Sequence, residues 1–150
     1  ARVWNYGLSS FDRTHVLKLV GHHEVGAGVA LGAVAGWMSG TPLNEFGVYP
    51  GLIDPVFVRQ RGTAGRTPSI WDLSLRLGYQ PPVGSGARLR PRVTVDFLHI
   101  GSQKKPVTYD QLHYLTGDPD WTFSDPSPTY LEPTQYQPGP SVRVGAEVEF

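Results

Sequence analysis

Few residues in this chain have the types and the spacing that metal or acid–base chemistry needs. His22 and His23 are adjacent, and a pair of His side chains can bind a metal ion. On a strand, however, adjacent side chains point to opposite faces and chelate poorly. A polar turn is therefore the simpler interpretation of this pair, and we expect no metal site here.

Acidic residues cluster in the segment GDPDWTFSDPS, which contains Asp118, Asp120 and Asp125. Calcium needs several oxygen ligands, and three carboxylates from one loop could supply some of them. Asp followed by Pro is also a common way to build a turn. Turn formation is the main interpretation, and calcium binding is the alternative.

A possible acid–base pair lies in the segment TYDQLHY, where Asp110 precedes His113. Neither residue is accompanied by a nucleophile in a recognisable catalytic pattern. Packing of the loop, with contacts from Tyr109 and Tyr114, explains the segment as well. We expect no catalytic residue, no cofactor and no enzymatic activity in this chain.

Composition narrows the classes of protein that remain possible. The 150 residues carry no net charge, which argues against a nucleic-acid partner, and the absence of Cys excludes disulfides and thiolate sites. No apolar run approaches the roughly 18 residues of a membrane-spanning helix. Mean hydropathy is weak evidence in this case, because a transmembrane strand needs only every second residue to be apolar.

Alternation of apolar and polar residues is the dominant pattern, and it predicts an all-β protein. The clearest example is SVRVGAEVEF at the end of the chain. The pattern predicts an antiparallel meander of about five strands, at 12–21, 27–38, 69–80, 88–100 and 141–150.

Each predicted strand has two different faces. One face is apolar and consists of Leu73, Leu75, Leu77, Val93, Val95, Val142, Val144 and Val148. The other face is charged and consists of Arg76, Arg90, Arg92, Asp96, Arg143, Glu147 and Glu149. The simplest role for the charged face is a water-facing wall with cross-strand ion pairs, and passage of a cargo or docking of another domain is the functional alternative.

The connections alternate in length. Short turns are expected at 22–26 and 81–87 and long loops at 41–68 and 101–140, so in a meander both long loops lie at one end of the sheet. This asymmetry is typical of outer-membrane barrels, which also have aromatic girdles about 25 Å apart. Four aromatic residues lie near the ends of the apolar face, where we expect such girdles: Trp37, Trp71, Tyr79 and Phe150. A soluble β-sheet domain would also alternate.

Four segments resemble a known family: FDRTHVLKLVG, GWMSGTPLN, RTPSIWDLSLRLGYQ and PTQYQPGPSVRVGAEVEF. They are similar to the C-terminal barrel region of TonB-dependent outer-membrane receptors, and most similar to the Oar-like branch, which often carries a carboxypeptidase-regulatory-like N-terminal domain. Such receptors have a barrel of about 22 strands closed by a plug. The resemblance therefore implies that this chain is the last part of such a barrel, without the plug and most of the strands.

The resemblance also implies a function and partners. The expected function is transport of a substrate across the outer membrane of a Gram-negative bacterium, with the long loops outside the cell. The expected partners are membrane lipid, the missing strands and plug, the TonB complex through the missing N-terminal part, and the assembly machinery, which would recognise Phe150. Two alternatives remain: a soluble ligand-binding module that uses the long loops, and a short subunit that assembles with others into a barrel.

Five strands cannot close a transmembrane barrel, since the smallest have about eight. The strands at 12–21 and 141–150 should therefore be the edges of the sheet. We expect 141–150 to pair antiparallel with 88–100.

Overall fold

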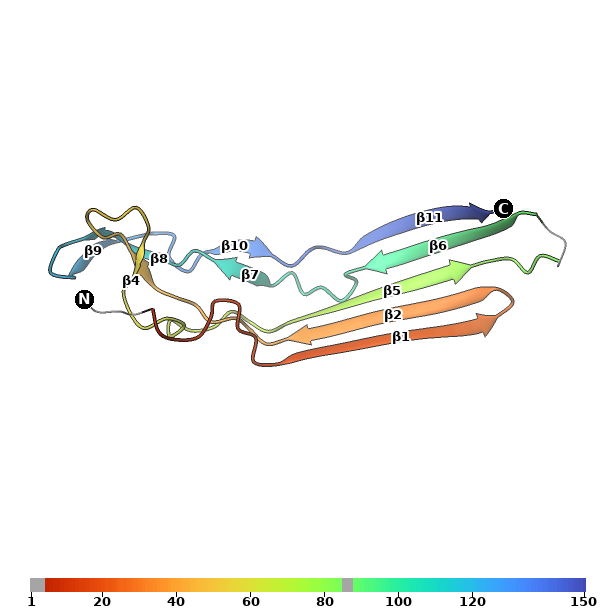
Figure 1. Ribbon diagram of the computed structural model, residues 1–150, viewed down its shortest axis with the longest axis horizontal. Coiled ribbons are helices and arrows are strands. Elements are labelled where there is room, and N and C mark those ends of the chain that lie inside the picture. The colour runs from red at the N-terminus through yellow and green to blue at the C-terminus, as the bar shows by residue number, and fades with distance from the viewer. Residues whose placement is uncertain (1–4, 85–87) are drawn as a thin grey trace. The chain divides into compact units, whose positions relative to one another are not determined.

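The computed structural model describes residues 5–84 and 88–150, and these residues form strands, turns and extended segments (Figure 1). None of them lies in a helix long and apolar enough to cross a membrane. The chain divides into two compact units. The sheet unit comprises Val16–Met38, Ile70–Lys104 and Pro138–Phe150. The loop unit comprises the N-terminal residues up to His15, together with Ser39–Ser69 and Lys105–Gln137.

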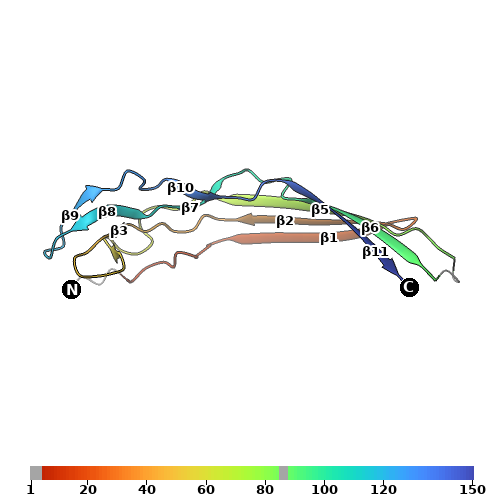
Figure 2. The same cartoon turned by 90° about the horizontal axis from the view of Figure 1, so that it is seen from above.

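The sheet unit is a five-stranded antiparallel meander, with strand order β1-β2-β5-β6-β11. Seen on edge, these strands form a single twisted layer (Figure 2). Their bounds are Val16–Gly26 for β1, Val29–Met38 for β2, Ile70–Tyr79 for β5, Arg90–Leu98 for β6 and Ser141–Glu149 for β11.

The predicted fold class is confirmed as all-β and, in the sheet unit, antiparallel. Strand β11 pairs antiparallel with β6, as the sequence predicts, and the register places Val144 opposite Val95. Strands β1 and β11 are the two edges, so within the described residues the sheet does not close into a barrel. Membership of a transmembrane barrel therefore stays a prediction.

The first hairpin corrects the predicted turn at 22–26. Those residues belong to β1, and the turn consists of Ala27 and Gly28, which have φ angles of 51° and 82°. Positive φ at both positions is the geometry of a tight two-residue hairpin turn, which matches the twist of the strands. The polar run His22-His23-Glu24 suggested a turn, but its side chains alternate between the two exposed faces of an edge strand.

The other strands of the sheet unit lie inside their predicted ranges. Strand β5 occupies 70–79 of the predicted 69–80, and β6 occupies 90–98 of the predicted 88–100. Residues 85–87 of the predicted short turn at 81–87 lie outside the described residues.

The two long loops are more ordered than the sequence suggests. Strands β3 (Phe46–Gly47), β4 (Val56–Phe57), β8 (Leu112–Gly117) and β9 (Phe123–Pro126) form a sheet in the order β4-β3-β8-β9. In it β3 and β8 run parallel, and the other pairs are antiparallel. Strand β7 (Pro106–Tyr109) pairs antiparallel with β10 (Pro133–Tyr136). These strands are too short to show alternation, and Pro stands at the ends of three of them, where the ladder tolerates it.

Polar groups hold the centre of the loop unit. Pro42 and Leu43 are buried there, and beside them Asn44 is 2% exposed. The Asn44 side chain accepts a hydrogen bond from the Gly62 N–H (2.8 Å) and donates one to Ser10 Oγ (3.0 Å). Its backbone N–H donates to Gln111 Oε1 (2.6 Å). Through its side chain and its backbone N–H, this one buried residue connects three distant segments of the chain.

Candidate functional site

The five strands of the sheet unit place their apolar side chains on one surface, which we call the apolar face. Residues directly opposite each other in a ladder lie on the same face, and Leu75 is opposite Phe97 while Val95 is opposite Val144. The face is formed by Leu17, Leu19, Leu31, Ala33, Ala35, Leu73, Leu75, Leu77, Val93, Val95, Phe97, Val142, Val144 and Val148.

The apolar face is uncovered. Leu19 is 61% exposed, Val142 61% and Val144 68%, and no aliphatic side chain of the described sheet unit is buried. Monomeric soluble proteins rarely expose a continuous apolar surface of this extent, and larger patches usually contact a partner or a membrane. The face therefore requires either a covering partner or an apolar solvent.

Aromatic side chains lie at both ends of the apolar face. Trp37 faces Trp71 at one end of the β2–β5 ladder, and Tyr79 faces Val29 at the other end. The eight residues from Trp71 to Tyr79 span about 26 Å at ~3.3 Å each. Phe150 occupies the next alternate position after Val148 and is fully exposed. This arrangement has the spacing of two girdles, whose contact with lipid stays a prediction.

An ion network lies on the opposite surface, the polar face. Asp96 on β6 is 4% exposed and accepts hydrogen bonds from Arg76 on β5 (2.5 and 3.0 Å) and from Arg143 on β11 (2.7 and 3.0 Å). Charge-assisted bonds of this bidentate kind are among the stronger hydrogen bonds in proteins. A single carboxylate thus connects three neighbouring strands.

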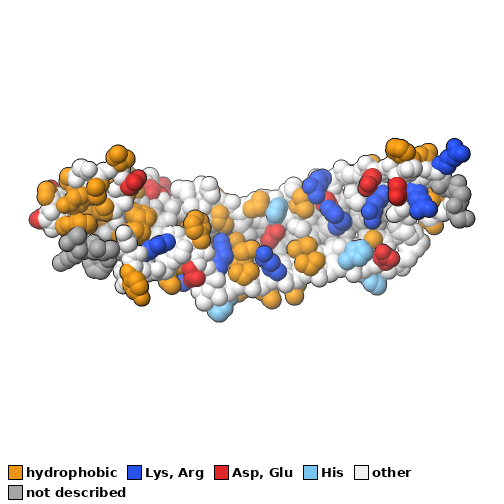
Figure 3. Space-filling model, in the orientation of Figure 1, with side chains coloured by type: hydrophobic (Ala, Val, Ile, Leu, Met, Phe, Trp, Pro, Cys, Tyr) orange, Lys and Arg blue, Asp and Glu red, His pale blue; other side chains and the backbone are white. Residues whose placement is uncertain are grey.

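Charged residues of opposite sign continue along β6 and β11. Arg92 lies opposite Glu147, and Arg90 lies opposite Glu149. Over the five strands, the surface drawn in Figure 3 carries basic and acidic side chains close together. All seven residues predicted for the charged face therefore lie on one side of the sheet, away from the apolar face.

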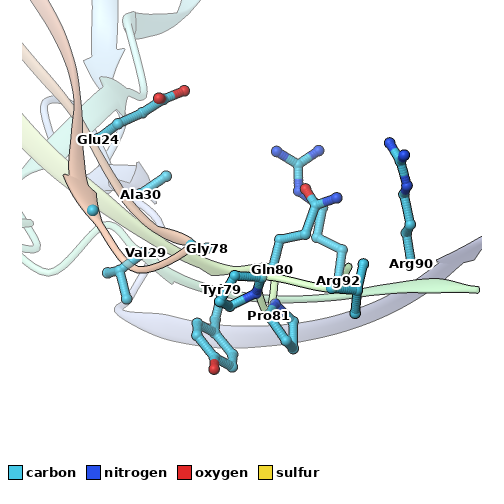
Figure 4. Close-up of a pocket in the computed structure, with 13 residues that line it drawn as sticks. Glu24, Val29, Ala30, Gly78, Tyr79, Gln80, Pro81, Arg90 and Arg92 are labelled. Atoms are coloured by element: carbon cyan, nitrogen blue, oxygen red, sulfur yellow. The ribbon is translucent and has the colours of Figure 1, made fainter. Parts of the chain in front are cut away.

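A hollow of about 410 Å³ lies on the sheet unit near the β1–β2 turn. Figure 4 shows Glu24, Gln80, Arg90 and Arg92 extending to one side of the sheet, while Tyr79 extends to the other side. The hollow thus opens on the polar face, and its lining combines a carboxylate, an amide and two guanidinium groups.

The polar face is not charged throughout. On β1 and β2, Val20 lies opposite Val34, and these side chains are 78% and 51% exposed. The charges belong mainly to β5, β6 and β11. The sequence pattern of β1 was too weak to reveal this difference.

His22 and His23 lie on opposite faces of β1. His22 is opposite Gly32 on the polar face, and His23 is opposite Leu31 on the apolar face. The two imidazoles therefore cannot bind one ion together.

The loop unit contains a buried charge cluster that the sequence did not reveal. The Glu45 side chain is 3% exposed, and its Oε1 lies 2.6 Å from His113 Nδ1. Arg59 forms an ion pair with the other carboxylate oxygen of Glu45. Asp110 was a possible acidic partner of His113 beside the preferred interpretation of loop packing, and in the structure the carboxylate next to His113 is that of Glu45.

Asp110 has a structural role. Its carboxylate accepts hydrogen bonds from the Leu112 N–H (3.0 Å) and from Thr129 Oγ1 (2.6 Å). A carboxylate occupied by its own loop in this way closes the turn, as aspartates often do.

Two tyrosines enclose the His113 ring. The Tyr130 ring stacks on it with centroids 3.9 Å apart and planes 2° apart, and the Tyr114 ring stacks with centroids 4.0 Å apart. Burial, and then the nearby Glu45 carboxylate, raise the pKa of Tyr130 above its ordinary value. The stack and the Glu45 cluster fix β8 against the segments around it.

The acidic segment at 118–125 is organised by Thr122. Its Oγ1 lies 2.8 Å from Asp120 Oδ1 and 3.2 Å from Asp118 Oδ2. Hydrogen bonds from the Thr122 hydroxyl and backbone lower the pKa of Asp120. Within 5–84 and 88–150 no three His, Asp or Glu side chains are grouped so that they could hold a metal ion. The bonds from Thr122 to both carboxylates have the local character of a turn.

Comparison with known proteins gives one informative match. The chain is 33% identical over 114 residues to the TonB-dependent transporter Oar of Myxococcus xanthus, and the match covers 73% of this chain but 11% of the relative. No protein-family model matches the chain, and no solved structure matches it. The chain thus spans a small part of the curated relative. These findings support a distant relationship of this chain, over part of its length, to a TonB-dependent receptor.

Proposed function

We propose that this chain is a segment of a transmembrane β-barrel in a TonB-dependent receptor, and that it serves transport of a substrate across the outer membrane of a Gram-negative bacterium. The observation that carries the proposal is the uncovered apolar face of the sheet unit, backed by a polar face with an ion network. Transmembrane barrel strands have this alternation, with lipid on one side and water on the other.

The open edges of the sheet are consistent with the proposal. In lipid an unpaired backbone N–H or C=O costs several kcal/mol, so an open sheet is not viable alone. In the proposed barrel, the outer edges of β1 and β11 pair with strands that this chain does not contain. The similarity to a much longer transporter supports a larger assembly of this kind.

The other proposed partners follow from the same assignment. Lipid contacts the apolar face, and a plug and the TonB complex belong to the parts of the receptor beyond this chain. The loop unit faces the cell exterior, and the assembly machinery contacts the strand that ends in Phe150. The proposed role assigns no chemical reaction to this chain.

Labelling of single cysteines in the whole protein would test the proposal. The chain has no Cys, so Val95→Cys on the apolar face and Thr94→Cys on the polar face give a matched pair on neighbouring residues of β6. In outer membranes, a photoactivatable lipid should label position 95 and not 94. A water-soluble maleimide should react with 94 far more than with 95.

Failure of the lipid to label position 95 would support a soluble ligand-binding module instead. In that case the protein would remain in solution without detergent, and the maleimide would react with both positions or be excluded at 95 by a protein partner. The ordered strands and aromatic contacts of the loop unit, such as the Tyr49–Trp121 pair at 4.7 Å, are the observation that favours this second candidate.

A further inference from the structure

The pairing of β6 with β11 needs a determinant of its register. A short turn fixes the register of an ordinary hairpin, but here the stretch 99–140 separates the two strands. The apolar face discriminates poorly between registers, because similar residues repeat along both strands: Val93 and Val95 on β6, and Val142, Val144 and Val148 on β11. A slip by two residues would keep similar apolar side chains opposite one another.

The polar face, in contrast, carries a pattern that fits in one register. Arg90, Arg92, Thr94 and Asp96 on β6 lie opposite Glu149, Glu147, Gly145 and Arg143 on β11, in that order. Two basic residues face two acidic ones, and beyond the Thr–Gly pair the signs are reversed. Opposite charges directly across an antiparallel ladder stabilise it, and like charges destabilise it.

Slips by two residues lose the central pair of this pattern. In one direction Asp96 would face Gly145, and Arg143 would face Leu98. In the other direction Asp96 would face Ser141, and Arg143 would face Thr94. Either slip would break the two hydrogen bonds that Asp96 accepts from Arg143, and charge-assisted bonds of this kind are among the stronger ones in proteins.

The Thr94–Gly145 pair adds a steric element. A Cβ atom at position 145 would lie 2.9 Å from Thr94 Oγ1, so the threonine hydroxyl occupies the space that Gly145 leaves free. A slip would bring the larger Glu147 or Arg143 to this place. Charge and shape therefore favour the same register.

We propose that these residues form a register lock that selects a single pairing of β11 with β6. Its central element is Asp96, held by Arg143 from β11 and by Arg76 from β5. The two Arg–Glu pairs and the Thr94–Gly145 contact extend it toward the end of β11. The lock concerns the pairing of two strands, so it holds whether or not the apolar face meets lipid.

Disulfide trapping in the whole protein reads the register directly. Val93 and Ala146 are directly opposite, so Val93→Cys with Ala146→Cys reports the observed pairing. Val95→Cys with Ala146→Cys reports a slip by two. A disulfide requires Cβ atoms about 3.8 Å apart, whereas diagonal neighbours are about 7–8 Å apart. Under mild oxidation the first pair should crosslink on the order of tenfold more than the second.

A variant with a displaced pattern gives the decisive comparison. Arg143→Ser, Gly145→Arg and Glu147→Gly together move the sequence pattern of β11 by two residues. The slipped register would then pair an arginine at 145 with Asp96 and Glu149 with Arg92. We expect the crosslinking preference to reverse, so that 95–146 exceeds 93–146. A preference for 93–146 as strong as that of the parent protein would overturn the proposal.

Exchanging the charges of one pair distinguishes an effect on register from a general loss of stability. Arg92→Glu and Glu147→Arg each place like charges opposite, and each should lower the 93–146 yield severalfold. The double variant restores an opposite-charge pair in the observed register and should recover the yield. Equal yields in all variants, or no recovery in the double variant, would show that charge does not set the register.

Discussion

The sheet unit and the loop unit differ in which side chains they bury. In the loop unit Leu43, Asn44 and Glu45 are buried, and their hydrogen bonds join segments distant in sequence. In the sheet unit Asp96 is the only buried charged residue described, and the aliphatic side chains are all at least partly exposed. The loop unit therefore has a small buried centre of its own, whereas the sheet unit has none.

This difference indicates where each unit obtains its stability. A single-layer sheet gains little from burial of its own side chains, so its surroundings must supply the missing apolar contacts. The loop unit depends on internal hydrogen bonds and stacked rings. Substitutions should therefore act through the environment in the sheet unit and through specific contacts in the loop unit.

The largest effect is expected on the apolar face. Val95→Arg should cost about 2–4 kcal/mol of folding free energy in lipid, as Arg does near the midplane of transmembrane barrels. Thr94→Arg, one residue away on the polar face, should cost much less. Folding titrations into lipid vesicles would measure both, and equal costs would contradict the two-faced membrane interpretation.

The next effect concerns the loop unit. Glu45→Ala removes the buried carboxylate that binds both His113 and Arg59, and it should lower local stability by about 1–3 kcal/mol because hydrogen bonds to a charged group are lost. Asp110→Ala is the matched control, since its carboxylate accepts hydrogen bonds from Leu112 and Thr129 and none from His113 or Arg59. Hydrogen exchange of the β8 amides would compare the two variants. A larger loss of protection in the control would mean that Glu45 is not central.

A smaller effect on the fold is expected from deletion of Phe150. Its side chain is fully exposed, so the sheet should lose little stability. If the assembly machinery recognises this residue, as we propose, the amount of protein in the outer membrane should nevertheless fall. Immunoblots of outer-membrane fractions would test this, with Phe150→Tyr as the control that keeps an aromatic ring. Unchanged levels after deletion would refute the recognition role.

The sequence predicts the sheet unit well, because long alternating strands carry their own signal. Val93, Val95, Val142 and Val144 occupy the face that their spacing indicates, and β11 lies beside β6 as expected. The first turn was misplaced because His22, His23 and Glu24 are polar on both faces of an edge strand.

The loop unit was largely beyond prediction because its contacts are remote in sequence. Phe46 pairs with Leu112, and Glu45 meets His113 across 68 positions. Strands of two to six residues are too short to show periodicity. A parallel pairing such as β3–β8 is not joined by a hairpin turn, so no turn residues in the sequence indicate it. Asp110 was considered as a partner of His113 only because the two are close in sequence. Closeness in sequence does not determine which carboxylate contacts an imidazole.

The smallest effect belongs to an exposed turn of the loop unit and depends on pH. The pKa of Asp120 is lowered from its ordinary value of 3.8 by hydrogen bonds from Thr122, so folding favours the ionised carboxylate. The resulting stabilisation is present above pH 3.8 and is lost as the pH falls through the lower folded pKa. Protection of the Thr122 amide should therefore decrease on acidification below about pH 4, while amides of the β8 strand change less. In the Asp120→Asn variant this decrease in protection should disappear, because the asparagine side chain does not titrate. A decrease of the same size in that variant would assign the acid sensitivity to a group other than Asp120.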